Sequence, residues 1–154
     1  MGFFKLVHQY SPKMNIRKAE VKDAEVIARL LEQLGYPTEN GLVARRLSLL
    51  ADNDEHLDVV VETGEKVLGF MSLHFIPQIA FDADYAVISY LIVEEKARKQ
   101  GVGKILEEYA VEISIVRKCR RIFLHSNARR TDAHRFYLRQ GYQEYAKAFV
   151  KYLR

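Results

Sequence analysis

The 154-residue chain is 49% hydrophobic and 29% charged, the composition of an ordinary soluble globular protein with room for one domain and its core. No apolar run approaches the ~20 residues that cross a bilayer, and a net charge of +4 is too mild to argue for nucleic acid. The single cysteine, Cys119, excludes an intramolecular disulfide and predicts a reducing, cytoplasmic location.

The first third of the chain is expected to hold one strand and two helices. Residues 15–19 have the pattern of a first strand, so 1–13 are expected to be an N-terminal extension or tag and 14–154 a single domain. Asp23 is placed to cap a helix whose apolar residues follow helical spacing until Gly35 ends it. A second amphipathic helix follows after a short turn.

The remainder of the chain mixes strands and helices. Residues 57–62 and 67–75 are rich in β-branched and aromatic residues around a hairpin signal at 63–66. A loop over 77–84 leads to a strand over 85–93. The later elements are expected to be a helix over 102–117, a strand over 121–125, a helix over 132–139 and strands over 142–153. Helices placed between hairpin-connected strands indicate an α+β fold with one mixed sheet.

The most informative segment runs from an apolar strand into a basic turn that opens a helix. Gly101 and Gly103 allow a close approach to the backbone, while Arg98, Lys99 and Lys104 add positive charge. Amides at a helix start have no internal partner and point outward, which suits a phosphate or pyrophosphate. A basic loop with two turn glycines has the same pattern, so this motif alone leaves both interpretations open.

Spacing excludes two other phosphate-binding loops. A dinucleotide fingerprint needs glycine or alanine where Leu106 stands, and a P-loop needs glycine where Arg98 stands. A P-loop also continues as Lys-Ser or Lys-Thr, whereas Lys104 precedes Ile105.

A second motif further along the chain decides between the interpretations. It reads Ala133-x-x-Phe136-Tyr137-x-x-x-Gly141-Tyr142 and follows Arg98-x-x-Gly101-x-Gly103. The two motifs in this order resemble those of the GNAT superfamily of acetyl-coenzyme A-dependent N-acetyltransferases. Within it, residues 132–142, with weaker support from 69–74, are most similar to the aminoalkylphosphonate N-acetyltransferases.

The resemblance implies a central, mostly antiparallel and splayed sheet flanked by helices, with acetyl-coenzyme A as co-substrate. In the family the splayed strand binds the pantetheine arm through its main chain, and the glycine-bearing turn binds the pyrophosphate. Asn127 would contact the pantetheine arm, and it also fits a turn or capping role. The implied cofactor-binding residues are Leu91, Ile92, Val93, Arg98, Lys99, Gln100, Gly101, Val102, Gly103, Lys104 and Asn127.

The implied reaction is direct attack of a primary amine, on a small molecule or a protein, on the thioester. Tyr137 matches the family's general acid for the departing thiolate. A phenol is ordinarily a weaker acid than a thiol by about 2 kcal/mol, so full proton transfer is uphill. A more acidic phenol and a phenol that only hydrogen-bonds to the thiolate therefore both stay open.

The base and the acceptor site are less defined. Relatives often carry a carboxylate on the strand that leads into the cofactor motif, but residues 86–90 contain none. This departure predicts deprotonation of the amine through water, with candidate bases Asp82, Asp84, Tyr85 and His74. In this fold the turn at 35–40 and the loop at 77–85 usually select the acceptor. The candidate substrate residues there are Glu39, Asp82, Asp84 and Tyr85.

Further expectations concern partners. The alternative function is a non-catalytic acyl-coenzyme A sensor, which the missing strand carboxylate favours and the retained Tyr137 opposes. Nucleic-acid binding through 98–104 and 117–121 ranks last because aromatic residues do not interleave with these charges. A homodimer through the apolar segment 146–153 stays open. No membrane partner is expected, because the sequence has no long apolar run. No metal is expected either, since no Cys, His or Asp cluster has ligand spacing.

Overall fold

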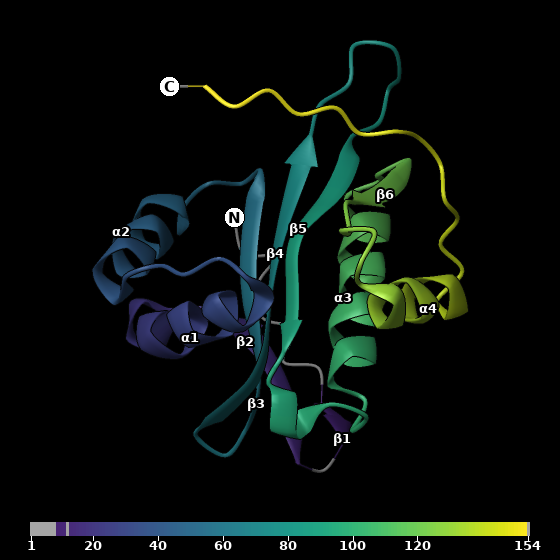
Figure 1. The fold of residues 1–154 in the computed structure, drawn as a ribbon. Helices are drawn as coiled ribbons and strands as arrows, with labels where there is room; N and C mark the ends of the chain where they lie inside the picture. The colour runs from purple at the N-terminus through teal and green to yellow at the C-terminus, as the bar shows by residue number, and fades with distance from the viewer. Residues whose placement is uncertain (1–8, 12, 154) are drawn as a thin grey trace. The chain divides into compact units, whose positions relative to one another are not determined.

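The structure, a computed structural model, describes residues 9–11 and 13–153. Six strands form one sheet in the order β1-β2-β3-β4-β5-β6 (Figure 1). The strands are β1 (Gln9–Ser11), β2 (Met14–Lys18), β3 (His56–Thr63), β4 (Lys66–Ile76), β5 (Tyr85–Val93) and β6 (Arg121–Leu124). The helices are α1 (Ala24–Leu34), α2 (Asn40–Leu50), α3 (Val102–Val116) and α4 (Thr131–Arg139), with short 3-10 helices η1 (Val21–Asp23) and η2 (Glu95–Ala97). Contacts along the chain define two compact units, Met1–Phe123 and Leu124–Arg154.

The sheet combines antiparallel and parallel pairing. Strands β1 to β5 each pair antiparallel with their neighbours. Strand β6 follows β5 after a crossover through α3. The amide of Arg120, just before β6, donates to the carbonyl of Asp84, just before β5, at 2.9 Å. Both strands therefore start at the same end of the sheet and run parallel, and the predicted class of α+β fold with a mixed, mostly antiparallel sheet is confirmed.

The sheet opens beside the second half of β5. Strand β6 has four residues and β5 has nine, so β6 reaches only the first part of β5 from their common start. Within β5, Ser89 is an extra residue, because Ser72 of β4 faces Tyr90 while Leu73 faces Ile88. The last residues of β5 extend beyond β6 on the edge away from β4, which is the splay that the resemblance implied.

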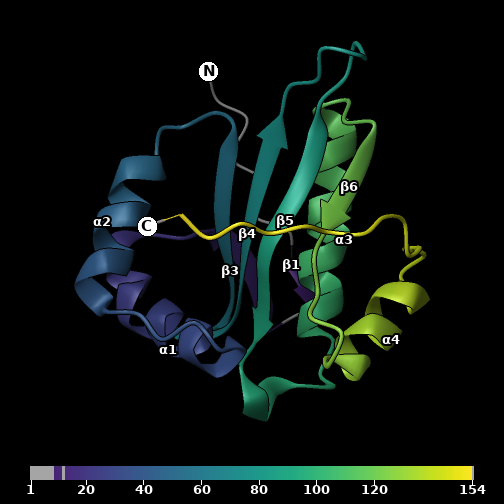
Figure 2. The same ribbon diagram turned by 45° about the horizontal axis from the view of Figure 1, so that its top comes forward.

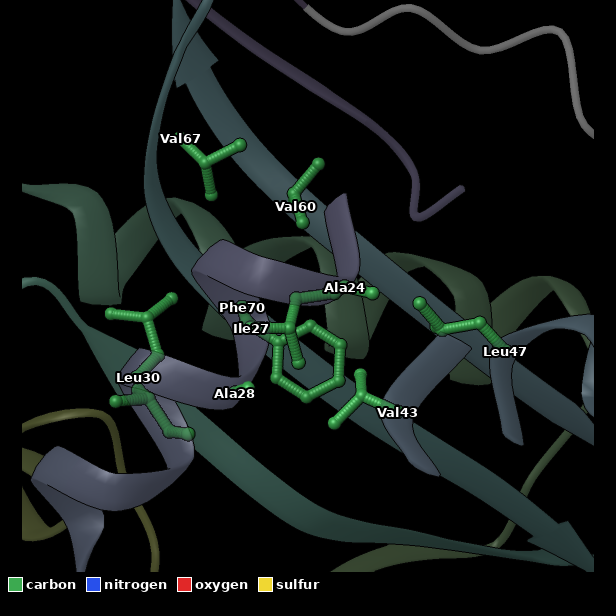
Figure 3. Packing of buried hydrophobic residues seen from close by; sticks show 10 residues of the cluster. Ala24, Ile27, Ala28, Leu30, Val43, Leu47, Val60, Val67 and Phe70 are labelled. Carbon is green, nitrogen blue, oxygen red and sulfur yellow. The ribbon is translucent and has the colours of Figure 1, made fainter. Parts of the chain in front are cut away.

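Helices cover both faces of the sheet. Figures 1 and 2 show α1 and α2 on one face and α3 on the other, so the central strands carry long apolar runs. The first face packs against the two helices through an apolar cluster (Figure 3) of Ala24, Ile27, Ala28, Leu30, Val43, Leu47, Val60, Val67, Phe70 and Ile92. On the second face α3 lies very close to β4, since a Cβ atom added at Gly69 would stand 2.8 Å from Cγ1 of Val102.

The prediction of strands at the C-terminal end is wrong. Residues 142–153 form neither helix nor strand. Apart from the half-buried Tyr142, their apolar side chains are exposed, with Phe149 at 93% and Tyr152 at 89% of the fully accessible area. An apolar run shows β propensity, but a strand also needs a neighbouring edge to satisfy its backbone groups, and the local pattern does not show whether such an edge is available.

Part of the predicted extension, 1–13, lies outside the described residues, and its residues Gln9–Ser11 form β1, which pairs with β2. The longest helix of the described residues is α3, with 15 residues. No helix in this part of the chain is both long enough and apolar enough to cross a membrane.

A partly buried ion-pair network joins β2, β3 and the start of α1. Asp23 does not cap α1 with its side chain as expected. Its carboxylate instead accepts two hydrogen bonds from Arg17, at 2.8 and 2.9 Å, and one from the amide of Glu20. Arg17 also donates to Glu62 at 2.9 Å. Burial acts to raise the pKa of Asp23, but the Arg17 and Glu20 hydrogen bonds outweigh it and hold that pKa below its ordinary 3.8.

Asp23→Asn is expected to lower the free energy of unfolding at pH 7 by about 3 kcal/mol, because it leaves the Arg17 charge half-buried without its main partner. Since the folded pKa of Asp23 is depressed, its contribution is present above pH 3.8 and is lost as pH falls through the folded value. Urea denaturation at pH 7 and pH 3 measures both effects. Asp52→Asn, at an exposed site, is the control, and a deficit of equal size at both pH values would contradict the prediction.

Candidate active site

The turn between β5 and α3 has an unusual backbone. After η2 the chain turns through Lys99 and Gly101, which have left-handed φ angles of 64° and 86°. Lys99 in this region carries steric strain of order 1–3 kcal/mol, which concentrates at functional sites. Gly101 is the N-cap of α3 and is not accompanied by a side-chain cap. The first intrahelical bond runs from the amide of Ile105 to the carbonyl of Gly101, so the preceding amides point out of the helix start.

The charges around this turn are suited to an anion. Arg98 and Lys99 are exposed, and the first turn of α3 contains no acidic residue. Lys104 lies 3.6 Å from Glu108 one helical turn later, where both side chains remain open to solvent. Outward amides, the positive end of the α3 dipole and these cations together fit a diphosphate. The predicted residues 98–104 are thus contiguous in one turn and one helix start.

Gln100 and Val93 have partners that the sequence did not indicate. The Gln100 side chain donates to the carbonyl of Lys96 at 3.1 Å, so it stabilises the turn itself. The carbonyl of Val93 accepts a hydrogen bond from the side chain of Gln33 at 2.9 Å, and Gln33 also accepts from the amide of Glu95 at 3.2 Å. Gln33, on α1, was missed because nothing in its own helix pattern indicates a contact 60 residues away.

On the α1 and α2 face, aromatic residues lie beside the splayed part of β5. Tyr36, in the turn between the two helices, contacts Tyr90 edge-to-face with ring centroids 5.6 Å apart. Tyr90 directly precedes Leu91 and packs against the apolar cluster of that face. In the same turn Glu39 is the N-cap of α2 through its backbone, with its carboxylate exposed.

The other predicted substrate residues lie at the opposite end of β5. Asp82 is exposed. The carbonyl of Asp84 accepts the hydrogen bond from the amide just before β6, and the Tyr85 hydroxyl accepts one from Arg121 at 3.1 Å. From Tyr85 to Leu91 is six residues of strand, about 20 Å at the usual rise. The structure therefore groups Asp82, Asp84 and Tyr85 together, but away from Leu91 and the end of the strand that leads into the glycine-bearing turn.

The second unit contains the two remaining predicted residues. Asn127 forms a turn, because its side-chain oxygen accepts from the amide of Arg129 at 3.0 Å and its carbonyl from Arg130 at 2.9 Å. Tyr137 on α4 is half-buried and makes edge contacts with the rings of Phe136 and Tyr142 at 5.2 and 5.5 Å. No group of three or more metal-ligating side chains occurs in the described part of either unit.

Gly101→Ala is expected to weaken acetyl-coenzyme A binding about tenfold and to lower the free energy of unfolding by about 1–2 kcal/mol. A Cβ atom there meets nothing within 4 Å, so the penalty comes from the left-handed φ of 86° and not from a collision. Relieving that strain re-orients the amides at the start of α3. Calorimetric titration and denaturation measure the two effects.

Gly64→Ala is the matched control, since Gly64 also has a positive φ, 58°, and open space, but lies in the β3–β4 hairpin. It is expected to lower stability similarly and to leave the affinity unchanged. Equal affinities for wild type and Gly101→Ala would show that the turn does not hold the diphosphate.

Comparisons with known proteins agree with this geometry. The acetyltransferase (GNAT) family model matches residues 24–142. The chain is 30% identical over 148 residues to aminoalkylphosphonate N-acetyltransferase of Salmonella typhimurium, covering 92% of this chain and 93% of that protein. Two solved structures share the fold. A GNAT family acetyltransferase of Staphylococcus aureus has a TM-score of 0.77 and 24% identity over 92% of this chain and 99% of its own. A transcriptional regulator of Bacillus halodurans has a TM-score of 0.84 and 23% identity, and the match covers 91% of this chain and 99% of that chain.

The protein has the fold of an acetyl-coenzyme A-dependent acyltransferase, and the turn with left-handed Lys99 and Gly101 follows the splayed strand. The chain belongs to the GNAT family of N-acetyltransferases. This confirms the resemblance that the two sequence motifs indicated.

Proposed function

We propose that this enzyme transfers the acetyl group of acetyl-coenzyme A to the primary amine of a small molecule by direct attack. The observation that carries the proposal is the start of α3, where left-handed Lys99 and Gly101 expose the first-turn amides beside Arg98. The family match over 24–142 spans both compact units, which supports treating 14–154 as one domain. The lone Cys119 is compatible with the cytoplasm.

The cofactor would be held along one line of main-chain groups. Residues 98–104 would bind the diphosphate, Arg98 and Lys99 by charge and Gly101 to Lys104 by their amides. Beyond β6, the outer edge of β5 at Leu91 would offer main-chain groups to the amide-containing pantetheine arm, whereas the carbonyl of Ile92 lies toward Gly69 of β4. Asn127 keeps its side-chain amide group for the same arm while its oxygen forms the turn.

The chemistry needs donors where negative charge develops. A backbone amide of β5 would donate to the carbonyl oxygen during attack, and the hydroxyl of Tyr137 would stabilise the sulfur as it leaves. A thioester supplies an activated acetyl group, so no metal chemistry is required of this chain. Glu39 is exposed in the turn that holds Tyr36, where its charge would attract a cationic amine.

Calorimetry with acetyl-coenzyme A tests the proposal first, with one site and a higher melting temperature at saturation expected. Thiol release is then assayed with 2-aminoethylphosphonate, spermidine, kanamycin and a lysine peptide. An unchanged melting temperature at saturating cofactor would contradict the assignment. Binding without turnover on any amine would favour the acyl-coenzyme A sensor instead.

A further inference from the structure

Two histidines and a carboxylate form a buried chain on strands β3 and β4. The Nε2 atom of His56 lies 2.7 Å from Oδ2 of Asp58, and its Nδ1 atom lies 3.0 Å from Nδ1 of His74. The side chains of His56 and Asp58 are only 4% and 12% exposed, whereas His74 is half-buried. The two imidazole rings are in contact, with centroids 4.4 Å apart.

The hydrogen bonds determine which nitrogen carries each proton. An ionised carboxylate only accepts hydrogen bonds, so Nε2 of His56 carries a hydrogen toward Asp58. In a neutral His56, Nδ1 is then the acceptor, and Nδ1 of His74 must donate to it. A neutral His74 protonated on Nδ1 has its lone pair on Nε2. Within the described residues that Nε2 makes no hydrogen bond, so this nitrogen is available as a base.

The register of the sheet places the His74 side chain on the face that α1 and α2 cover. Phe70, Ser72 and His74 alternate along β4 onto one face, and Phe70 belongs to the cluster under α1 and α2. Ser72 faces Tyr90 across the strand pair. The ring of Tyr90 contacts Tyr36, and Tyr90 directly precedes Leu91 in β5. His74 is two residues beyond Ser72, about 7 Å along the strand, and it faces Val87, four residues before Leu91, so a proton from an amine beside Tyr90 would have to reach it through water.

We propose that His74 is the base of the transfer reaction, taking the amine proton through water, and that His56 and Asp58 are positioning residues that stabilise the resulting charge. The proposal rests on the proposed acetyl transfer. The acceptor nitrogen forms the C–N bond with its lone pair, and the C–S bond breaks with its electron pair remaining on sulfur. One N–H proton passes through water to Nε2 of His74.

The hydrogen-bonded series His74, His56 and Asp58 can also stabilise the charge of the added proton. When Nε2 of His74 gains a hydrogen, the hydrogen on its Nδ1 can move to Nδ1 of His56, which puts the positive charge 2.7 Å from the Asp58 carboxylate. Burial, and to a lesser extent the neighbouring His56, lower the pKa of His74, while Asp58 acts to raise it. His74 is therefore neutral and able to accept a proton at pH 7.

The proton positions can be measured without any substrate. Nitrogen-15 NMR of the imidazoles is expected to show His56 protonated on Nε2 and His74 on Nδ1 in the neutral protein. A neutral His74 protonated on Nε2 would overturn the proposal, because that nitrogen would have no lone pair to offer.

Kinetics then test the base itself, with 2-aminoethylphosphonate or the amine of highest turnover in the panel. His74→Gln is expected to lower kcat/KM about 100-fold at pH 7 and to remove the acidic limb of the pH profile, with the Kd of acetyl-coenzyme A unchanged. Asp58→Asn keeps an acceptor for His56 but removes its charge, so kcat/KM should fall about tenfold with the limb displaced to lower pH. Asp54→Asn, in the exposed turn before β3, is the matched control.

An unchanged kcat/KM and an unchanged acidic limb in a folded His74→Gln variant would overturn the base role. Failure of the proposed function gives a different result, since wild type would then bind no acetyl-coenzyme A in calorimetry, or would bind it without releasing thiol on any amine, and the base role would fall with it.

Discussion

Tyr137→Phe is expected to lower kcat about 100-fold while the Kd of acetyl-coenzyme A stays within twofold of wild type. The substitution removes only the hydroxyl and keeps the ring that contacts Phe136 and Tyr142. A donor that acts on the departing sulfur is needed in the transition state and not in the bound state, so its loss appears in kcat. Steady-state thiol release and calorimetry measure the two constants.

Tyr152→Phe is the matched control, because Tyr152 is 89% exposed in the C-terminal segment. It removes the same hydroxyl and is expected to leave kcat unchanged. A Tyr137→Phe variant with the kcat of wild type would show that Tyr137 only packs within α4. A variant with weaker cofactor binding and unchanged kcat would instead place the hydroxyl on the bound cofactor.

Gly69→Ala is expected to lower the free energy of unfolding by about 1–3 kcal/mol and to weaken acetyl-coenzyme A binding at least tenfold. The added methyl carbon would lie 2.8 Å from Cγ1 of Val102, 3.1 Å from the carbonyl of Ile92 and 3.2 Å from Cδ1 of Leu106. Val102 is stiff and buried, so the start of α3 must move away from the sheet. The same movement shifts the amides at the start of α3, which we propose to bind the diphosphate. Denaturation and calorimetry measure both losses.

Two variants separate overpacking from the loss of glycine itself. Gly41→Ala adds a methyl group where nothing lies within 4 Å, inside α2, and is expected to leave stability unchanged or about 0.5–1 kcal/mol higher. Adding Val102→Ala to Gly69→Ala removes the colliding methyl group and should restore part of the affinity. A double variant no better than Gly69→Ala would show that Val102 is not the cause.

Elements with strong local patterns were predictable from the sequence. The strand predicted at 85–93 is β5 with the same limits, and the helix predicted at 102–117 is α3, Val102–Val116. Apolar periodicity and the glycine before Val102 mark these limits locally. The predicted strands over 142–153 failed, because a strand depends on a neighbouring edge that its own residues do not encode.

The chain's own residues were sufficient to identify the family and to predict the turn that suits a diphosphate. The glycines and basic residues lie within one short stretch, 98–104, and the left-handed φ of Gly101 is one that glycine adopts without strain. Only the tertiary structure brought Gln33 to Val93 and His56 to His74. Such pairs depend on strand register and helix placement, and a one-residue change in register turns every later side chain to the opposite face of the sheet.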